Sequence, residues 1–210
     1  SMMAQSIGSV LSGTTYPSDD PEMLAVEADY AAREAQLQEE IDNIENSHPG
    51  YDEYRYDLDM IGHDPHELAA FLSAVLQGYT RQSAQAELAR VFAAQYQLTL
   101  TEEVEIRYRT ETSTDPETGE TTSEEVPYEY YILNVKLTSK PISAVASELL
   151  TPEQMEMYQV YRQTTGNKPL LFGGGSPDTS GSEDLSGVQF INGTRPGNPQ
   201  LVELAKSQVG

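Results

Sequence analysis

The 210-residue chain contains no cysteine, and this absence limits its chemistry first. Without cysteine these residues form no disulfide, no thiolate zinc site and no cysteine nucleophile. Such a composition suits a cytosolic protein, and equally an extracytoplasmic protein of a bacterium that does not use disulfides. Tryptophan is also missing, whereas tyrosine occurs 13 times. No stretch approaches the roughly 18 consecutive apolar residues that a membrane-spanning helix needs.

Basic residues are scarce. Twelve lysines and arginines face 34 acidic residues, so the formal net charge is −22. A chain of this charge is repelled by phosphate backbones and by anionic lipid headgroups. We therefore expect no nucleic-acid partner and no charge-driven membrane binding. The charge itself identifies no partner, because many soluble proteins are acidic merely to stay dispersed.

Composition divides the chain into four segments. Residues 1–19 are rich in Ser, Gly and Thr and predict a flexible lead-in, and residues 20–172 carry the foldable α+β pattern. Residues 173–197, rich in Gly, Ser and Asp, predict a flexible linker. Asn198 and Pro199 then begin an apolar helix within 198–210, which we interpret as the truncated start of a further domain. Any catalytic machinery is expected to lie beyond these residues.

Helical periodicity recurs in the foldable segment. A long helix is predicted from Asp20 to about Asn46, because apolar residues recur every seven positions along it. A second helix is predicted to begin at Asp64-Pro65 and end at Gly78, and a third to run from Thr80 to Tyr96, the two packing as an antiparallel pair. Two short helices are predicted after Pro141 and after Thr151, where a capping box precedes Pro152.

The periodicity changes to two between the helices. Leu98, Leu100, Val104, Ile106 and Tyr108 share one parity and predict a strand with one buried face. Residues 115–120 predict a turn, and the return strand is expected at about 125–138 with a bulge near Tyr130. Helices gathered around one long hairpin indicate an α+β fold.

Three sets of side chains invite a functional interpretation. His63 and His66 with Glu67 suggest a metal site, but their spacing of three spans a helix start, and helix capping explains the same residues. The carboxylate doublets Glu102-Glu103, Glu124-Glu125 and Asp52-Glu53 suggest a glycosidase, but adjacent residues of a strand point to opposite faces.

Tyrosines gather in two places and suggest a stacking surface for sugars or peptides, although packing explains many of them. These are Tyr51, Tyr54, Tyr56, Tyr128, Tyr130 and Tyr131. The run Gly173-Gly174-Gly175-Ser176 lacks the lysine and the helix of a phosphate-binding loop. We therefore assign no catalytic, cofactor-binding or metal residue and no cofactor.

The order of several segments resembles one group of proteins. The matching segments are YPSDD (16–20), YDEY (51–54), DLDMIGHDP (57–65), AQYQLTL (94–100), YYILNV (130–135), LTPEQM (150–155) and NKPLLF (167–172). They resemble the non-catalytic region of cell-wall hydrolases carried by conjugative elements of Firmicutes. In that group a membrane-anchored region precedes a C-terminal CHAP or NlpC-type cysteine peptidase or amidase domain. Residues 201–210 resemble the first helix of a CHAP domain, upstream of its nucleophilic cysteine.

The resemblance implies an extracytoplasmic accessory module that positions a peptidoglycan hydrolase during conjugative transfer. The implied partners are its own catalytic domain, conjugation-channel proteins or peptidoglycan, with membrane contact only through an upstream anchor. No catalytic residue carries over, because the family's cysteine and histidine match no residue here. Two alternatives remain open: a muramidase-like hydrolase using two glutamates, and a structural domain that oligomerises through the first helix.

Overall fold

The computed structural model describes residues 13–173, which fall into two units divided between Asn167 and Lys168. The first unit is α+β, with helices and a three-stranded mixed sheet, so the predicted fold class is confirmed. The predictions for residues 1–12 and 174–210, including the linker and the terminal helix, lie outside the described residues. Within the described part, no helix combines the length and apolar character needed to cross a bilayer.

The long first helix forms as two pieces. Helix α2 spans Asp20–Asp42 and α3 spans Ile44–Ser47, with Asn43 leaving helical geometry between them. Proline in the first turn of α2 suits the helix start, since its missing N–H has no intrahelical partner there. The seven-residue stripe is buried as predicted, through Met23, Val26, Tyr30, Leu37, Ile41 and Ile44.

The sheet has the order β1-β3-β2, with β1 at Glu53–Leu58, β2 at Tyr96–Thr114 and β3 at Thr121–Ser139. Strands β2 and β3 pair without interruption from Tyr96 opposite Ser139 to Thr114 opposite Thr121. The predicted bulge near Tyr130 is therefore wrong. Gly119, at φ 73°, donates to Asp115 across the predicted turn.

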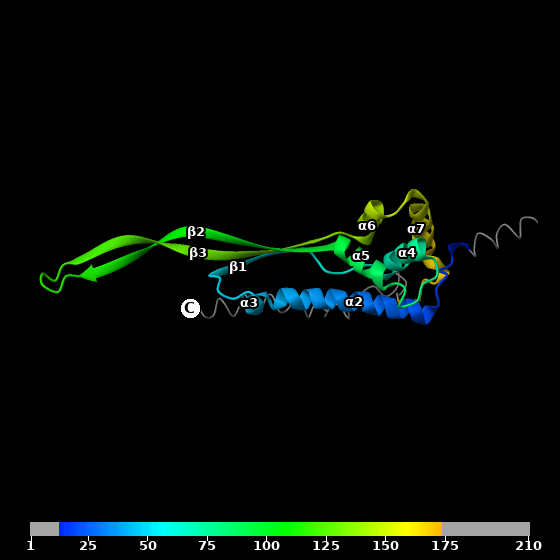
Figure 1. Ribbon diagram of the computed structural model, residues 1–210, viewed down its shortest axis with the longest axis horizontal. Helices are drawn as coiled ribbons and strands as arrows, with labels where there is room; N and C mark the ends of the chain where they lie inside the picture. Colours follow the sequence, from blue (N-terminus) through cyan, green and yellow to red (C-terminus); the bar gives the residue numbers. More distant parts are fainter. Residues whose placement is uncertain (1–12, 174–210) are drawn as a thin grey trace, which may run out of the picture. The chain divides into compact units, whose positions relative to one another are not determined.

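Strand β1 was not expected from the sequence. It pairs parallel with β3, from Glu53 beside Ile132 to Leu58 beside Leu137. Its tyrosines and carboxylates alternate without an apolar run, and the last four of its six residues are exposed. Figure 1 shows it alongside the half of β3 that lies nearer the helices.

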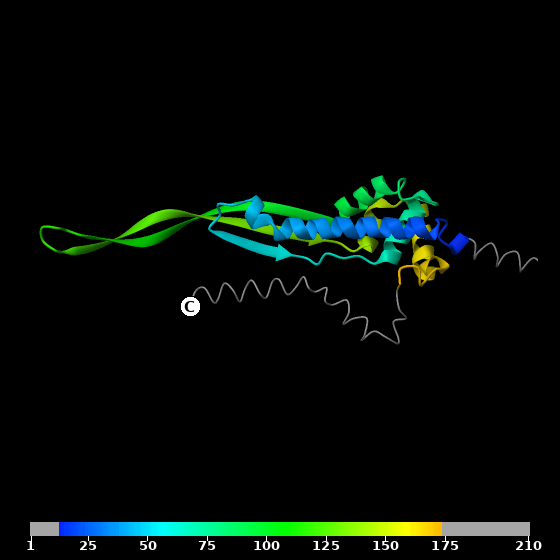
Figure 2. The same ribbon diagram turned by 90° about the horizontal axis from the view of Figure 1, so that it is seen from below.

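Helices α2 and α3 cover one face of this sheet, as the two views together show (Figures 1 and 2). Leu37 and Ile41 pack with Leu137 and Tyr96, and Ile44 packs with Leu133 and Val135. Farther along the hairpin this cover ends. Val104, Ile106 and Tyr108 are exposed there, contrary to the buried face that their parity predicted.

The remaining helices pack around the near end of the sheet. They are α4 (Pro65–Leu76), α5 (Gln85–Gln95), α6 (Ile142–Leu149) and α7 (Pro152–Thr164), followed by η1 (Thr165–Asn167). The predicted antiparallel pair of α4 and α5 is wrong, because α4 packs mainly on α7 and α5 contacts α6 and α2. Helix α5 begins at Gln85 rather than Thr80. In the turn before it, the side chains of Thr80 and Ser83 each accept a hydrogen bond from the other's backbone N–H. The capping box at Thr151 is confirmed.

Candidate functional site

His63 forms the most concentrated charged contact of the first unit. It lies in the loop between β1 and α4, and its side chain is only 4% exposed. Its Nδ1 is 2.8 Å from Oε1 of Glu34, and its Nε2 is 2.8 Å from Oε1 of Glu27. The two glutamates stand seven residues apart on α2, so they share one face of that helix. We call these three residues the histidine clamp.

The clamp holds His63 in its charged form. Burial by itself would lower the pKa of His63, but the hydrogen bonds and the charges of Glu27 and Glu34 raise this pKa to about 9. A carboxylate only accepts hydrogen bonds, so a carboxylate at each ring nitrogen requires a proton on both nitrogens. The side chain is therefore an imidazolium at neutral pH, and the clamp has one positive and two negative groups.

A hydrogen-bonded shell continues from the clamp. Tyr96 donates from its hydroxyl to Glu34 and accepts at 2.8 Å from the backbone N–H of Gly62. Tyr30 donates to the side-chain oxygen of Gln95, whose amide donates in turn to the carbonyl of Gly62 at 3.2 Å. The ring of Tyr30 also meets the His63 ring edge-on, with centroids 4.7 Å apart.

Burial raises the pKa of both Tyr30 and Tyr96 above the usual value of a phenol, so both remain donors. The shell ties three parts of the fold together: α2, the loop before α4, and the junction of α5 with β2. Both ring nitrogens of His63 are already hydrogen-bonded to carboxylates, so neither is open to another partner. The arrangement orders a loop against a helix and leaves the imidazolium little access to a substrate.

His66 belongs to a different cluster. Its Nδ1 lies 2.9 Å from the hydroxyl of Tyr16, and the two rings stack with centroids 6.0 Å apart. Its backbone N–H donates to Asp64, the N-cap of α4, as the capping interpretation predicted. Glu67 instead pairs with Arg162 of α7 at 3.1 Å.

The structure therefore separates the three residues of the possible metal site. Within residues 13–173, no group of three His, Asp or Glu side chains is arranged to hold a metal ion. Sequence reasoning also missed the partners of His63. A usable signal was present, because Glu27 and Glu34 flank Tyr30 in the apolar stripe of α2, where a charged residue needs a partner.

The carboxylate doublets split as strand geometry requires. Glu102 accepts from the hydroxyl of Tyr51 at 2.8 Å, whereas Glu103 accepts from the amide of Asn134 at 3.0 Å. In the same way, Asp52 accepts from the backbone N–H of Tyr131 at 2.8 Å, and Glu53 turns to the other face. None of these contacts brings two carboxyl groups of one doublet together.

A groove between α2 and the start of α5 holds two further carboxylates. Arg81 binds Asp29 with two guanidinium hydrogen bonds of 2.8 and 2.7 Å, and its backbone N–H donates to Glu22 at 2.6 Å. The hydrogen bond from Arg81 is the main cause that lowers the pKa of Asp29. A glycosidase needs one carboxyl group kept protonated beside an ionised one. Asp29 is held in the ionised form here by Arg81, so it does not fit the role of the protonated acid in such a pair.

Tyr51, Tyr54 and Tyr130 of the clustered tyrosines are engaged within the fold. Tyr51 and Tyr54 pack edge-on with ring centroids 5.7 Å apart, beside Ile44, Leu133 and Val135. Tyr130 donates to Glu53 at 3.0 Å, and the guanidinium carbon of Arg107 lies 3.4 Å from its ring centroid. The carboxylates that surround Arg107 and Arg55 complete an ion-pair network on this face of the sheet. Tyr56 is 44% exposed.

Comparison of the chain with protein-family models, with curated proteins and with solved structures finds no match.

Proposed function

We propose that residues 20–172 are a non-catalytic positioning module of an extracytoplasmic peptidoglycan hydrolase used in conjugative transfer. The proposal joins the segment resemblance to one observation about the β2–β3 hairpin. Strand β1 and helices α2 and α3 hold the half of the hairpin nearer the helices, and the other half extends without a third strand. A module of this kind holds one end of a rigid ribbon and presents the other at a distance.

The held half is fastened by three elements. Strand β1 pairs with β3 from Glu53 to Leu58, and α2 and α3 cover the same stretch with Leu37, Ile41 and Ile44. The histidine clamp then fastens α2 to the loop that leaves β1. Apolar packing, ladder hydrogen bonds and a buried ion pair thus act on one segment, which favours a stiff base for the ribbon.

The unsupported half begins beyond Ile132, the residue of β3 that pairs with Glu53 at the start of β1. From Val104 opposite Tyr131 to Thr114 opposite Thr121, the ribbon has two strands, and within the described residues no third strand pairs with it. Tyr131, at the start of this stretch, still exchanges backbone and side-chain hydrogen bonds with Asp52. Figure 1 shows this stretch running away from α4, α5, α6 and α7. Under the proposal it reaches toward a component of the transfer machinery or the wall, while a catalytic domain beyond residue 197 cuts the peptidoglycan.

The oligomerisation alternative relied on the apolar stripe of α2. Met23, Tyr30 and Ile41 of that stripe are at most 3% exposed within a single chain. Because the stripe is already buried in its own sheet and helices, it offers no surface for a second helix. The positioning role is therefore the better-supported of the two.

Peptidoglycan turbidity clearing tests the proposal. The 210-residue chain would be assayed beside a version extended through the following domain, with both tested for retention on purified wall. Clearing by the extended protein alone is the expected result. Clearing by the 210-residue chain would overturn the proposal and return the carboxylates of the first unit to consideration as catalysts.

A further inference from the structure

The unsupported half of the hairpin has two unlike faces. Residues directly opposite each other in the ladder share a face, so one row of side chains alternates with the other along each strand. One face carries a set of apolar and aromatic side chains that we call the apolar ribbon face: Val104, Ile106, Tyr108, Pro127 and Tyr131. Val104, Ile106 and Tyr108 are 46%, 57% and 64% exposed.

The opposite face is covered by its own side chains. Arg107 lies over the ring of Tyr130 and pairs with Glu105 at 3.1 Å. Arg109 lies 5.7 Å from the ring centroid of Tyr128 and pairs with Glu111 at 3.1 Å. Both arginines of the unsupported ribbon are thus on this face, where carboxylates and aromatic rings already engage them.

The apolar ribbon face continues a surface that is buried elsewhere in the molecule. Leu133, Val135 and Leu137 lie on the same side of the hairpin and are at most 3% exposed under α2 and α3. The cover from α2 and α3 stops at Ser47, and Tyr51 extends it to Glu102, whereas the apolar row goes on to Tyr108. An apolar row exposed to water next to a buried one is typical of a protein-binding surface.

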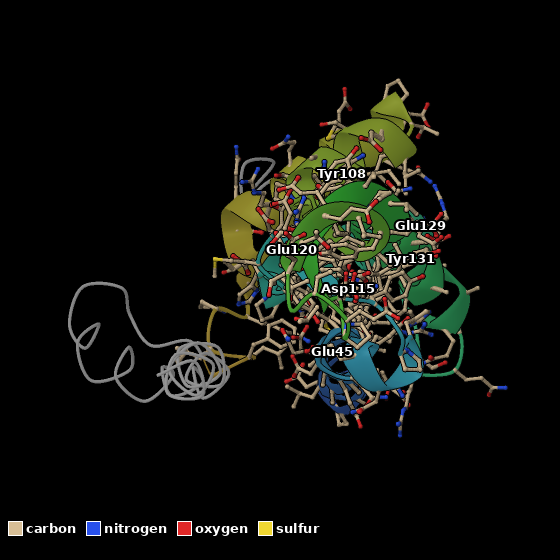
Figure 3. All side chains as sticks on the ribbon, turned by 90° about the vertical axis from the view of Figure 1, so that its left-hand side faces the viewer. Glu45, Tyr108, Asp115, Glu120, Glu129 and Tyr131 are labelled. Atoms are coloured by element: carbon tan, nitrogen blue, oxygen red, sulfur yellow. The ribbon has the colours of Figure 1, made fainter. Side chains whose placement is uncertain are left out.

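Charge restricts the partner. On this face, positions 104–114 and 121–131 contain no lysine or arginine, but they contain Glu125 and Glu129. Glu129 stands directly opposite Ile106, within the apolar row, and accepts a hydrogen bond from Tyr131. Figure 3 looks along the ribbon from its tip, with Asp115 and Glu120 at the turn and Tyr108, Glu129 and Tyr131 on the strands behind it.

We infer that the apolar ribbon face binds a polypeptide segment of another protein that presents apolar side chains interspersed with lysine or arginine. This inference rests on the proposed positioning function, for which it names the chemistry of the partner. A second copy of this chain would bring Glu125 and Glu129 against the same acidic residues, and an anionic lipid or nucleic acid would be repelled. The apolar side chains of a cationic segment would pack on the apolar ribbon face, and its lysine or arginine would pair with Glu129.

The test uses a labelled peptide that alternates valine and tyrosine with lysine, and the same peptide with glutamate in place of lysine. Binding to the 210-residue chain would be measured by fluorescence anisotropy at low and physiological salt. Amide chemical shifts of the isotopically labelled protein would locate the site. We expect the lysine peptide to bind and to shift amides of 102–110 and 125–131, and the glutamate peptide not to bind.

Two variants separate this face from the general negative charge of the chain. The double substitution Ile106→Thr with Tyr108→Thr places threonine, which favours strands, at two exposed positions. It should weaken binding at least about tenfold, as for central interface residues. Val126→Thr, a matched change on the opposite face, should leave binding unchanged. Glu129→Gln should weaken binding and reduce its salt dependence.

No loss in the double variant would overturn the inference, because binding would then follow net charge alone. Equal loss in the Val126→Thr variant would also overturn it, because binding would then not be specific to the apolar ribbon face. Sedimentation of the wild type and the double variant examines self-association. A dimer that the double variant abolishes would replace the heterologous partner with a second copy. Wall clearing by the 210-residue chain would refute the proposed function while leaving these binding results intact, so the two failures are distinguishable.

Discussion

The charged state of His63 predicts a loss of stability at mildly alkaline pH. In the folded protein its pKa is about 9, against an ordinary value of 6.5, because Glu27 and Glu34 outweigh the effect of burial. The folded state therefore holds a proton more tightly than the unfolded chain does. A raised pKa of this kind stabilises the fold fully below pH 6.5, and the contribution disappears as the pH rises through 9.

The size of the effect follows from the two pKa values. One pKa unit is worth about 1.4 kcal/mol, so the interval from 6.5 to about 9 corresponds to about 3 kcal/mol of unfolding free energy. Losing this amount is a large change for a domain whose total stability is typically about 5 to 15 kcal/mol. The raised pKa values of Tyr30 and Tyr96 act only at higher pH, since an unfolded tyrosine ionises near pH 10.

Urea denaturation followed by circular dichroism would measure the effect between pH 6 and 9.5. Urea is preferable to guanidinium because it leaves charge interactions unscreened. We expect the wild type to lose about 3 kcal/mol across this range. His63→Gln should be less stable than the wild type at pH 6 by a similar amount, and it should show little dependence on pH.

His48→Gln is the matched control, because His48 is exposed and contacts Ser47 rather than a pair of carboxylates. It should change stability by less than about 0.5 kcal/mol and keep the wild-type pH dependence. An NMR titration of the His63 ring gives an independent value for its pKa. A wild type equally stable at pH 6 and pH 9, or a midpoint for His63 near 6.5, would refute the histidine clamp as a charged contact.

Three further predictions concern the frame and the ribbon. Gly166→Ala should lower the free energy of unfolding by about 2 kcal/mol or more, because the residue has φ +59° and a Cβ there would lie 2.3 Å from the ring of Tyr16. Gly62→Ala, where a Cβ meets open space, is the control in the same urea titration. Thr151→Ala should cost about 1 kcal/mol through the lost cap of α7, and Thr151→Ser should restore most of it. Replacing 111–124 with an Asn-Gly turn should change the urea midpoint by the equivalent of less than about 1 kcal/mol, since those side chains are exposed, and a larger loss would show that the tip supports the core.

Features that depend on a few neighbouring residues were predictable from the sequence. The N-cap at Asp64 and the capping box at Thr151 formed because a side-chain oxygen and backbone N–H groups two or three residues away satisfy each other locally. The turn at 115–120 and the buried stripe of α2 likewise follow from short-range chemistry and from a periodicity carried within one element. Together these features were enough to place the chain in the α+β class.

Tertiary structure alone decided how these elements cover one another. The parity of Val104, Ile106 and Tyr108 told which side of the strand they occupy, but their exposure depends on where α3 ends, a length that β2 does not encode. Strand β1 forms because β3 offers it an open edge, although the paired residues Glu53 and Ile132 are far apart in the sequence.

The candidate site shows the same division. His63 could be identified as an ionisable residue beside a helix start, but its charge is set by two glutamates from a helix that precedes it by about 30 residues. An electrostatic contact depends on distance and on the exclusion of water, and both arise only when the loop folds onto α2. The sequence by itself determined which helices and turns could form, whereas packing determined that His63 is a buried cation and that the end of the ribbon is bare.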